Sequence, residues 1–392
     1  MIVNKKTVGS ELKKEKAVEK QEELSQSEDP YGGRLKIKEY NCLSPQNKAM
    51  SSIEGLKNKI ELFGQEEILK QVTELYRMRI TEYYLSLIKD IKDINDPVRK
   101  QCVPSIDELN DQDDSEMDPL GEVSTSPVSC LVHRYPDRAL LLVTGRCFMY
   151  CRHCTRKRLW KNDCSDYSLE DIQKAVDYIK KNEQIREIII SGGDPLVLAT
   201  ERLEYIIELV SNVKHIEVIR LGTRTPVVFP KRIDRSLCKT LQRFKNLWIN
   251  VQFNHPREIT PESTAACQRL QQAGIPLSNQ SVLLRGINDD VKTMKELCQK
   301  LQSIRVRPYY LFQCDPVVGA AHFRTSVFAG INIIENMRGH TSGMCIPQFV
   351  IDGVDGKGKI PLMPDYLLSA SPDCLLLRNY EHKVFSYKNP NP

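Results

Sequence analysis

Apolar residues recur along this chain with two different periods, and the change between them divides the sequence. From Ser51 to about Ile94 the large apolar residues repeat every three or four positions, a spacing typical of amphipathic helices. They are Ile53, Leu56, Ile60 and Phe63, then Ile68, Val72, Leu75 and Tyr76, and a further helical piece begins at Tyr83. The pattern predicts an all-helical N-terminal region. Asn95-Asp96-Pro97 and the acidic loop from Asp111 to Pro119 predict a break and a linker after it.

From Ala139 onward, short apolar or β-branched runs alternate with amphipathic stretches of ten to fifteen residues. The six runs are residues 140–145, 186–191, 216–222, 247–253, 277–284 and 306–313. Helices such as 168–181 and 289–301 separate them. Strands alternating with helices predict a parallel sheet. We therefore expect an α/β fold, a partial (β/α)6 TIM-type barrel with a helical N-terminal region and a C-terminal extension. Chemistry is expected at the carboxyl ends of its strands.

These patterns suggest four segments. Residues 1–45 are rich in Lys, Glu, Ser and Gln, a composition that cannot offset the entropy of ordering, so we expect a disordered tail. Residues 46–127 form the helical N-terminal region, 128–320 the barrel, and 321–392 a C-terminal region that carries a glycine-rich lysine loop.

Charge and cysteine content indicate which kinds of partner and which cellular location to expect. The 392 residues carry a net charge of +5, spread without basic blocks, which argues against nucleic acid and favours small molecules. Thirteen scattered cysteines, an odd number, fit reduced thiols and predict a cytoplasmic protein. The N-terminus lacks the apolar core of a signal peptide and no apolar run reaches 18 residues, so no membrane association is expected.

The most informative motif is a C-x3-C-x2-C run formed by Cys147, Cys151 and Cys154. Electron-carrier iron–sulfur clusters are usually held by four cysteines, and structural zinc by four ligands in paired spacings. Three cysteines on one loop therefore indicate a cubane cluster with one iron left open for substrate chemistry. A zinc loop or three structural thiols is the alternative.

Three further segments carry functional residue types. Ser191-Gly192-Gly193-Asp194 follows the second predicted strand, and its glycines would let backbone groups approach a ligand. A glycine-rich loop from Ile351 to Pro361 contains two lysines, Lys357 and Lys359, and a mobile, partly desolvated lysine is suited to forming a Schiff base. The segment from His133 to Arg138 has two arginines suited to binding phosphate.

Together, the strings CFMYCRHCTRKR at 147–158 and HRYPDR at 133–138, with the lysine loop, resemble the lysine 2,3-aminomutase family of radical S-adenosylmethionine enzymes. The resemblance implies an isomerase that converts L-lysine to L-β-lysine by 2,3-amino migration. It would use a 4Fe–4S cluster, S-adenosylmethionine and pyridoxal 5'-phosphate. By the same resemblance, Cys147, Cys151 and Cys154 bind the cluster and His153 contacts the adenine. The residues Ser191, Gly192, Gly193 and Asp194 would hold the methionyl end.

The resemblance also implies the remaining site residues. Lys359 is the lysine that matches the pyridoxal-phosphate lysine, and the phosphate cofactor would be held by Arg134, Tyr135, Arg138 and Gln280. Arg156 matches the arginine that binds the substrate carboxylate. Asp315 and Asp352 match the pair that binds the distal ammonium of lysine. Two buried carboxylates are costly without a cation between them, which agrees with a positively charged substrate end.

The chain also departs from the family pattern. Val354, Asp355 and Lys357 replace a proline and two glycines of the lysine loop, and Gln252 stands where histidine is common. Asp290 replaces a cysteine that binds structural zinc in some members, and the C-terminal cysteine cluster is missing, so no zinc is predicted. We expect a homo-oligomer and a one-electron reductant such as flavodoxin or ferredoxin.

Other functions stay open at this point. The same chemistry could act on arginine or another amino acid, or could serve β-lysylation of a translation factor. A zinc-binding or redox-sensing protein on the same barrel is the non-enzymatic alternative.

Overall fold

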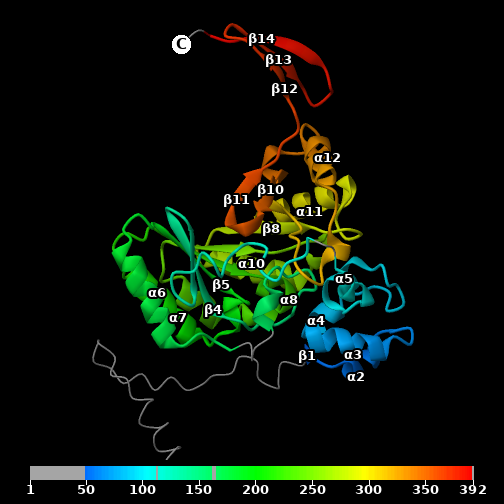
Figure 1. The fold of residues 1–392 in the computed structure, drawn as a ribbon, viewed down its shortest axis with the longest axis vertical. Coiled ribbons are helices and arrows are strands. Elements are labelled where there is room, and N and C mark those ends of the chain that lie inside the picture. The colour runs from blue at the N-terminus through cyan, green and yellow to red at the C-terminus, as the bar shows by residue number, and fades with distance from the viewer. Residues whose placement is uncertain (1–48, 112–113, 161–164, 391–392) are drawn as a thin grey trace, which may run out of the picture. The chain divides into compact units, whose positions relative to one another are not determined.

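The structure is a computed structural model that describes residues 49–111, 114–160 and 165–390. The expected disordered tail, residues 1–45, lies outside the described residues. The described part has the expected α/β architecture, with a curved central sheet and helices on its outer face (Figure 1).

The central sheet has nine strands in the order β11-β10-β9-β8-β7-β6-β5-β4-β3. Neighbours from β4 to β10 are parallel, and β3 and β11 pair antiparallel at the two edges. The strands are β3 (Leu131–Tyr135), β4 (Arg138–Thr144), β5 (Glu187–Gly192), β6 (Val218–Thr223), β7 (Leu247–Val251), β8 (Leu277–Leu283), β9 (Arg307–Gln313), β10 (Gln348–Gly353) and β11 (Gly358–Pro361). Because strands consecutive in sequence are also neighbours in space, the sheet winds in one direction and curls toward a barrel.

Helices connect the parallel strands and bury their apolar faces against the sheet. They are α6 (Leu169–Lys181), α7 (Thr200–Ser211), α8 (Thr225–Val228), α9 (Arg235–Leu241), α10 (Pro261–Gln272), α11 (Val291–Ser303) and α12 (Val327–Met337). Short 3-10 turns are η2 (Lys157–Trp160), η3 (Pro195–Val197), η4 (Pro230–Arg232), η5 (Pro256–Glu258), η6 (Ala321–Phe323), η7 (Gly343–Cys345) and η8 (Val354–Gly356). The core between the two layers is apolar: Ile172 and Val176 of α6 and Ile188 of β5 are all fully buried in it.

All six predicted strands are confirmed, with shifts of a few residues at their ends. The prediction missed a further parallel strand, β10, and the two antiparallel edges. The apolar run of β10 is only Phe349-Val350-Ile351, between Pro347 and Gly353, which is too short to show a strand period. As a result, the sheet continues past residue 320 into the segment that carries the lysine loop.

Alternate residues of the strands differ in burial, and this difference identifies the inside of the barrel. In β5 and β8, one set of alternating side chains is buried against the helices and the other set is partly exposed. The partly exposed set includes Ser191 and Gln280. Because the helices cover the outer face, this second set lines the concave side of the sheet. Side chains on the concave side therefore keep some exposed surface that a ligand could contact.

A side chain brings the two edges of the sheet together where strand pairing does not. Lys359 N on β11 donates to the Tyr135 hydroxyl on β3 over 2.8 Å. A Cβ added to Gly358 would lie 3.2 Å from the same hydroxyl, so a larger residue at 358 would crowd this contact. Tyr135 therefore ties the last strand to the first.

The N-terminal region contains the helices α2 (Ile53–Lys57), α3 (Glu66–Leu75), α4 (Glu82–Leu85), α5 (Pro97–Cys102) and the 3-10 helix η1 (Ile106–Leu109). The expectation of an all-helical region is corrected, because β1 (Ala49–Met50) and β2 (Ile80–Thr81) pair as a short antiparallel ladder. The first helix also ends earlier than predicted: Phe63 is half exposed in the left-handed region at φ 55°. Asp96 caps α5 at Val98 N and Arg99 N, so the predicted break begins a helix.

The C-terminal segment forms a separate three-stranded antiparallel sheet of β12 (Leu367–Ala370), β13 (Cys374–Arg378) and β14 (Val384–Lys388). Arg378 joins it to α12 through an ion pair with Glu335 at 2.7 Å. Large apolar side chains on this sheet are about half exposed, among them Leu367, Val384 and Phe385. The sheet is thus an apolar surface attached to the barrel.

The eleven cysteines in the described ranges all have free thiols. No helix in the described residues combines the length and the apolar character that crossing a bilayer would require.

A buried ion-pair group holds the N-terminal region against the barrel. Glu108 of η1 accepts hydrogen bonds from Arg152 at 2.6 and 2.8 Å and from Lys157 at 3.1 Å. All three side chains have no exposed surface. The two cations keep the pKa of Glu108 below its usual value although burial opposes this. Removing the anion would leave two buried cations facing each other.

Glu108→Gln should therefore destabilise the protein by about 3–5 kcal/mol, the usual cost of breaking a buried ion pair on one side. Urea unfolding followed by circular dichroism measures this loss. Glu170→Gln is the matched control, because Glu170 pairs with Lys174 on the surface of α6 and should change stability little. Equal effects of the two substitutions would contradict the role assigned to Glu108.

Candidate functional site

The predicted cluster loop follows β4 directly, at the carboxyl edge of the parallel sheet. Cys147, Cys151 and Cys154 are partly buried, and Cys154 N donates to Cys151 O over 3.0 Å in a tight turn. Burial, and then the neighbouring Cys151, raise the pKa of Cys154 to about 11. Cysteine binds iron as the thiolate, so each of the three thiols would lose its proton on binding a cluster.

No histidine, cysteine, aspartate or glutamate side chains within the described ranges gather in a group of three that could hold one metal ion. A cubane cluster does not need such a group, because each of its cysteines binds a different iron atom.

The Ser191–Asp194 turn supports this loop through its backbone. Gly193 N donates to Thr144 O over 2.6 Å, and Asp194 N donates to Arg146 O over 2.8 Å. A Cβ on Gly192 or Gly193 would lie 2.2 Å from those two carbonyl oxygens, so only glycine fits. The glycines were predicted for their approach to a ligand, and the structure uses them to pack the turn against the start of the cluster loop.

The carboxylate of Asp194 also fixes the neighbouring strand end. It accepts hydrogen bonds from the Thr223 hydroxyl at 2.7 Å, from Arg224 N at 2.8 Å and from Leu196 N at 3.0 Å. Burial raises the pKa of Asp194 despite these hydrogen bonds. Asp194 therefore holds the ends of β5 and β6 together beside the cluster loop.

His153 is buried beside the cluster loop. Burial, followed by the charges of Arg224 and Lys157, holds its pKa well below the usual value. Its Nε2 lies 3.1 Å from the Gln252 amide nitrogen, so the residue that departs from the family pattern contacts His153 directly. Its Nδ1 is buried with no partner in the structure. In a neutral ring whose Nε2 accepts, Nδ1 carries the proton, so it can donate to an acceptor on a ligand.

Lys359 lies in the hairpin of β10 and β11, directly opposite Asp352 in the register. Its Nζ is 2.8 and 3.1 Å from the two carboxylate oxygens of Asp352, and 5.1 Å from the centre of the Phe312 ring. The competing Lys357 is 68% exposed and pairs only loosely, at 3.8 Å, with the exposed Asp355. The structure therefore favours Lys359 as the lysine that faces the interior.

Asp315, at the end of β9, belongs to the same charged group. Its Oδ2 accepts from the Thr155 hydroxyl over 2.7 Å. Burial, followed by the charge of Asp352, raises the pKa of Asp315 to about 7, although the Thr155 hydrogen bond and Lys359 oppose this. The two predicted acids are thus brought together, and the ammonium of Lys359 is the cation that offsets their charge.

Arg156 extends from the cluster loop toward this group but is held by a residue that the sequence did not suggest. Its Nε and Nη2 donate to both carboxylate oxygens of Glu122 over 2.7 to 3.0 Å. Glu122 is 2% exposed, and Arg156 and Arg158 bring its pKa down to about 2 although burial opposes this. The pair fixes the orientation of the Arg156 guanidinium. Glu122 follows the segment interpreted as a linker, and it has no motif around it that could have identified it.

Only some of the predicted phosphate-binding residues contact one another in the structure. The Arg138 guanidinium lies 3.8 Å from the centre of the Tyr135 ring, and Tyr135 contacts Lys359, so these three are contiguous. Arg134 donates to Leu120 O, and its buried Nε has no partner in the structure. Gln280 lies on the concave side of β8, beside Tyr310 of β9 in the register. The contacts described do not join Gln280 to the other three.

Comparisons with known proteins identify the family to which the chain is similar. A family model described as "Radical SAM superfamily" matches residues 141–298, and one described as "Lysine-2,3-aminomutase" matches residues 334–392. An "L-lysine 2,3-aminomutase" of Clostridium subterminale is 52% identical over 87% of this chain and 82% of its own length. One of Fusobacterium nucleatum subsp. nucleatum is 48% identical over 87% and 80%. A "Glutamate 2,3-aminomutase" of Clostridioides difficile is 41% identical over 99% and 91%.

The raised pKa of Asp315 predicts a pH effect on the stability of the protein without ligands. An acid whose pKa is higher in the folded than in the unfolded protein favours folding at low pH, and this advantage is lost as pH rises through its folded value. The melting temperature of the wild type relative to Asp315→Asn should therefore fall between about pH 4 and 7. Differential scanning fluorimetry across this range tests it. Asp355→Asn, at an exposed position of the same hairpin, is the control; parallel curves for both variants would reject the prediction.

Proposed function

Because the chain belongs to the lysine 2,3-aminomutase family of radical S-adenosylmethionine enzymes, we propose that it converts L-lysine to L-β-lysine by moving the α-amino group to the β-carbon. The chain is thus a radical aminomutase, an isomerase that acts on an amino acid. The choice of lysine rests on one observation: Asp315 and Asp352 lie close enough for their charges to interact, and an ammonium group, that of Lys359, contacts Asp352 at 2.8 Å.

The family implies a 4Fe–4S cluster, S-adenosylmethionine and pyridoxal 5'-phosphate. When bound, these groups supply reversible hydrogen abstraction by a carbon radical and a carbonyl carrier for the migrating nitrogen. We propose that Cys147, Cys151 and Cys154 bind the cluster. The Ser191–Asp194 turn and the Nδ1 of His153 border the S-adenosylmethionine site; the donor character of that buried nitrogen supports this role.

For pyridoxal phosphate we propose Lys359 as the covalent anchor, with Arg134, Tyr135, Arg138 and Gln280 holding the cofactor. The support is the contiguous arrangement of Arg138, Tyr135 and Lys359 and the unpartnered Nε of Arg134 near the lysine hairpin. A Cβ on Gly356 would lie 3.4 Å from that Nε, which places the arginine beside the loop.

The substrate's two charged ends would be held by opposite charges on the protein. Arg156, kept in orientation by Glu122, binds the carboxylate of the amino acid. Asp315 and Asp352 bind the distal ammonium. In the structure the Lys359 ammonium lies against Asp352, and it stands in for the substrate's alkylammonium group. Once Lys359 is engaged elsewhere, Asp352 loses its cation, and a substrate with a terminal positive charge can replace it.

The same pair argues against glutamate, the substrate named for one relative. A glutamate side chain would bring a third carboxylate to Asp315 and Asp352, and like charges in a poorly solvated site repel strongly. Arginine, which also carries a terminal cation, is the competing substrate.

We further infer that a one-electron carrier such as flavodoxin or ferredoxin supplies the electron that reduces the cluster.

An anaerobic assay tests this function. The reconstituted protein is incubated with dithionite, S-adenosylmethionine, pyridoxal phosphate and L-lysine, L-arginine or L-glutamate, and β-amino acids are quantified by mass spectrometry. Lysine should be the preferred substrate, with product lost in Cys151→Ala and Lys359→Ala. Asp315→Asn should lower kcat/KM for lysine on the order of 100-fold, since one partner of a buried charge pair is lost. Asp355→Asn should keep full activity. Preferred turnover of arginine, or an unchanged kcat/KM in Asp315→Asn, would contradict the lysine assignment.

We also propose that the apolar sheet β12–β14 makes the chain a homo-oligomer, because a two-sided sheet with half-exposed Leu367, Val384 and Phe385 lacks a covering layer within the described residues. Light scattering after size exclusion should give a multiple of the 45.0 kDa chain mass. Phe385→Lys should reduce that mass toward one chain. Ile94→Lys, which changes an exposed apolar residue of the N-terminal region, is the control. A wild type that elutes as a monomer would overturn this proposal.

A further inference from the structure

Arg224 is a buried cation in contact with one of the proposed cluster ligands, and the site described so far does not use its side chain. It follows β6 directly and is 7% exposed. Its Nη1 donates to the Sγ of Cys151 over 2.8 Å. A guanidinium is always charged, so this contact places a fixed positive charge and a hydrogen-bond donor on one of the three cysteine sulfurs.

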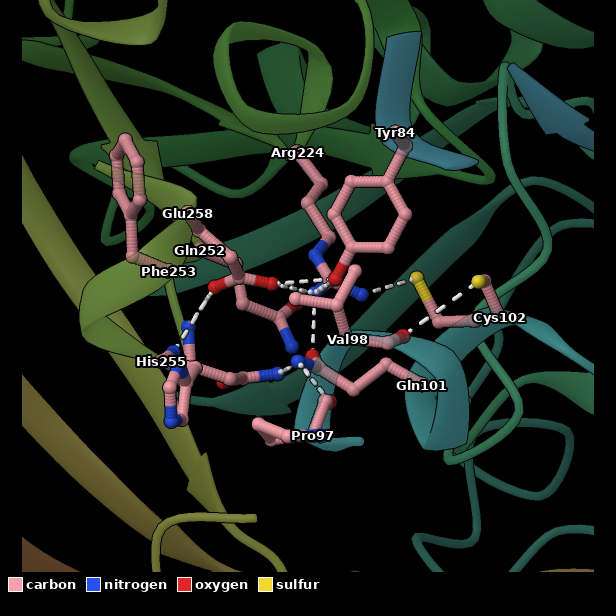
Figure 2. A network of polar contacts seen from close by, with 12 residues as sticks. Tyr84, Pro97, Val98, Gln101, Cys102, Arg224, Gln252, Phe253, His255 and Glu258 are labelled. Atoms are coloured by element: carbon pink, nitrogen blue, oxygen red, sulfur yellow. Dashed lines mark hydrogen bonds and ion pairs between the residues drawn. The ribbon is translucent and has the colours of Figure 1, made fainter. Parts of the chain in front are cut away.

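The Arg224 guanidinium is held in this position by groups from three other parts of the chain (Figure 2). Its Nη2 donates to Glu258 Oε1 at 2.7 Å and to Tyr84 Oη at 3.2 Å, and also to Gln101 Oε1. Its backbone N donates to Asp194. The side chain therefore cannot swing away from Cys151 without breaking buried hydrogen bonds, each of which is costly to leave unmade.

Glu258, the counter-anion, is held equally firmly. It has no exposed surface, and its Oε2 accepts from Asn254 N at 2.6 Å and from His255 N at 2.9 Å. The Tyr84 hydroxyl donates to its Oε1. The carboxylate neutralises one side of the guanidinium, and the other side faces the sulfur. The arrangement directs a positively polarised donor at Cys151 and balances its charge with an anion one contact farther away.

We infer that Arg224 is a positioning residue that orients the Cys151 sulfur and raises the reduction potential of the cluster, and that Glu258 moderates this effect. The inference rests on the proposed function, because it requires Cys151 to bind iron. Hydrogen bonds to the cysteine sulfurs and nearby charge set the potential of iron–sulfur clusters, since the reduced cluster carries one more negative charge. It also assigns a role to the N-terminal region, because Tyr84 and Gln101 come from α4 and α5.

The test is a redox titration of the reconstituted full-length chain, followed by the EPR signal of the reduced cluster and carried out without S-adenosylmethionine or amino acid. Arg224→Gln removes the charge and should make the cluster harder to reduce. The expected change is about tenfold in the reduced-to-oxidised ratio at a fixed potential, which is 59 mV for a one-electron couple. Glu258→Gln removes the balancing anion and should shift the midpoint in the opposite direction. Arg224→Lys keeps the charge and should give a smaller downward shift.

Tyr84→Phe is the matched control, because it removes a hydroxyl from the same network without changing any charge, and its midpoint should stay close to that of the wild type. Iron and sulfide analysis shows which variants bind a full cluster. A purely structural role would lower stability or cluster content but leave the midpoint unchanged in loaded protein. If Arg224→Gln does not bind a cluster, the midpoint potentials of Glu258→Gln and Arg224→Lys test the inference instead. Unchanged midpoints in the loaded variants would overturn the inference.

Failure of the proposed function would look different. A wild type that shows the EPR signal but does not isomerise lysine would reject the substrate assignment and leave the inference on Arg224 intact. A wild type that binds no cluster would reject both.

Discussion

The structure depends on a single constraint, that charged groups taken out of water must be paired inside the protein. Three such groups lie at or against the carboxyl rim of the barrel: Glu108, Glu122 and Glu258 each have 2% exposure or less. Each faces at least one arginine at hydrogen-bond distance. Burying an isolated carboxylate would cost several kcal/mol of folding free energy. The paired arginine offsets this cost only when its hydrogen bonds to the carboxylate have good geometry. They therefore fix the side chains that face the site rather than simply adding stability.

The topology explains how groups so far apart in sequence come to share one rim. Strands β4 to β10 are parallel neighbours in chain order, so every loop after a strand lands on the same side of the sheet. The cluster loop follows β4, the Asp194 turn β5, Arg224 β6 and Asp315 β9. The hairpin β10–β11 then brings Lys359 back to the first edge, where Tyr135 contacts it. The contact that joins the two edges of the sheet therefore also positions Lys359.

Much of this could be predicted from the sequence, because the strands between residues 140 and 313 have a clear apolar pattern and the cysteine, HRYPDR and lysine-loop motifs are local. The sequence could not predict which buried charged side chains contact one another. Glu122, Arg224 and Glu258 lie in stretches with no motif of their own, and the contacts Glu122–Arg156, Arg224–Cys151 and Arg224–Glu258 join residues that are 34 or more positions apart. The glycines of the Ser191–Asp194 turn were expected at a ligand, and their packing on Thr144 and Arg146 depends on a neighbouring loop that local sequence does not reveal. Strand β10 was missed because its apolar run is only three residues long.

The contact between Lys359 and Asp352 makes the properties of each residue depend on the other. Asp352 and Lys359 face each other because the hairpin register places them in one rung. In this state the ammonium compensates an acid pair whose other member, Asp315, has its pKa raised to about 7. Asp352 in the hairpin and Asp315 after β9 therefore form a carboxylate pair whose charge the Lys359 ammonium offsets. Under the proposed function, the residue that anchors the cofactor also supplies the cation that offsets these two acids, and the terminal ammonium of the substrate then takes its place.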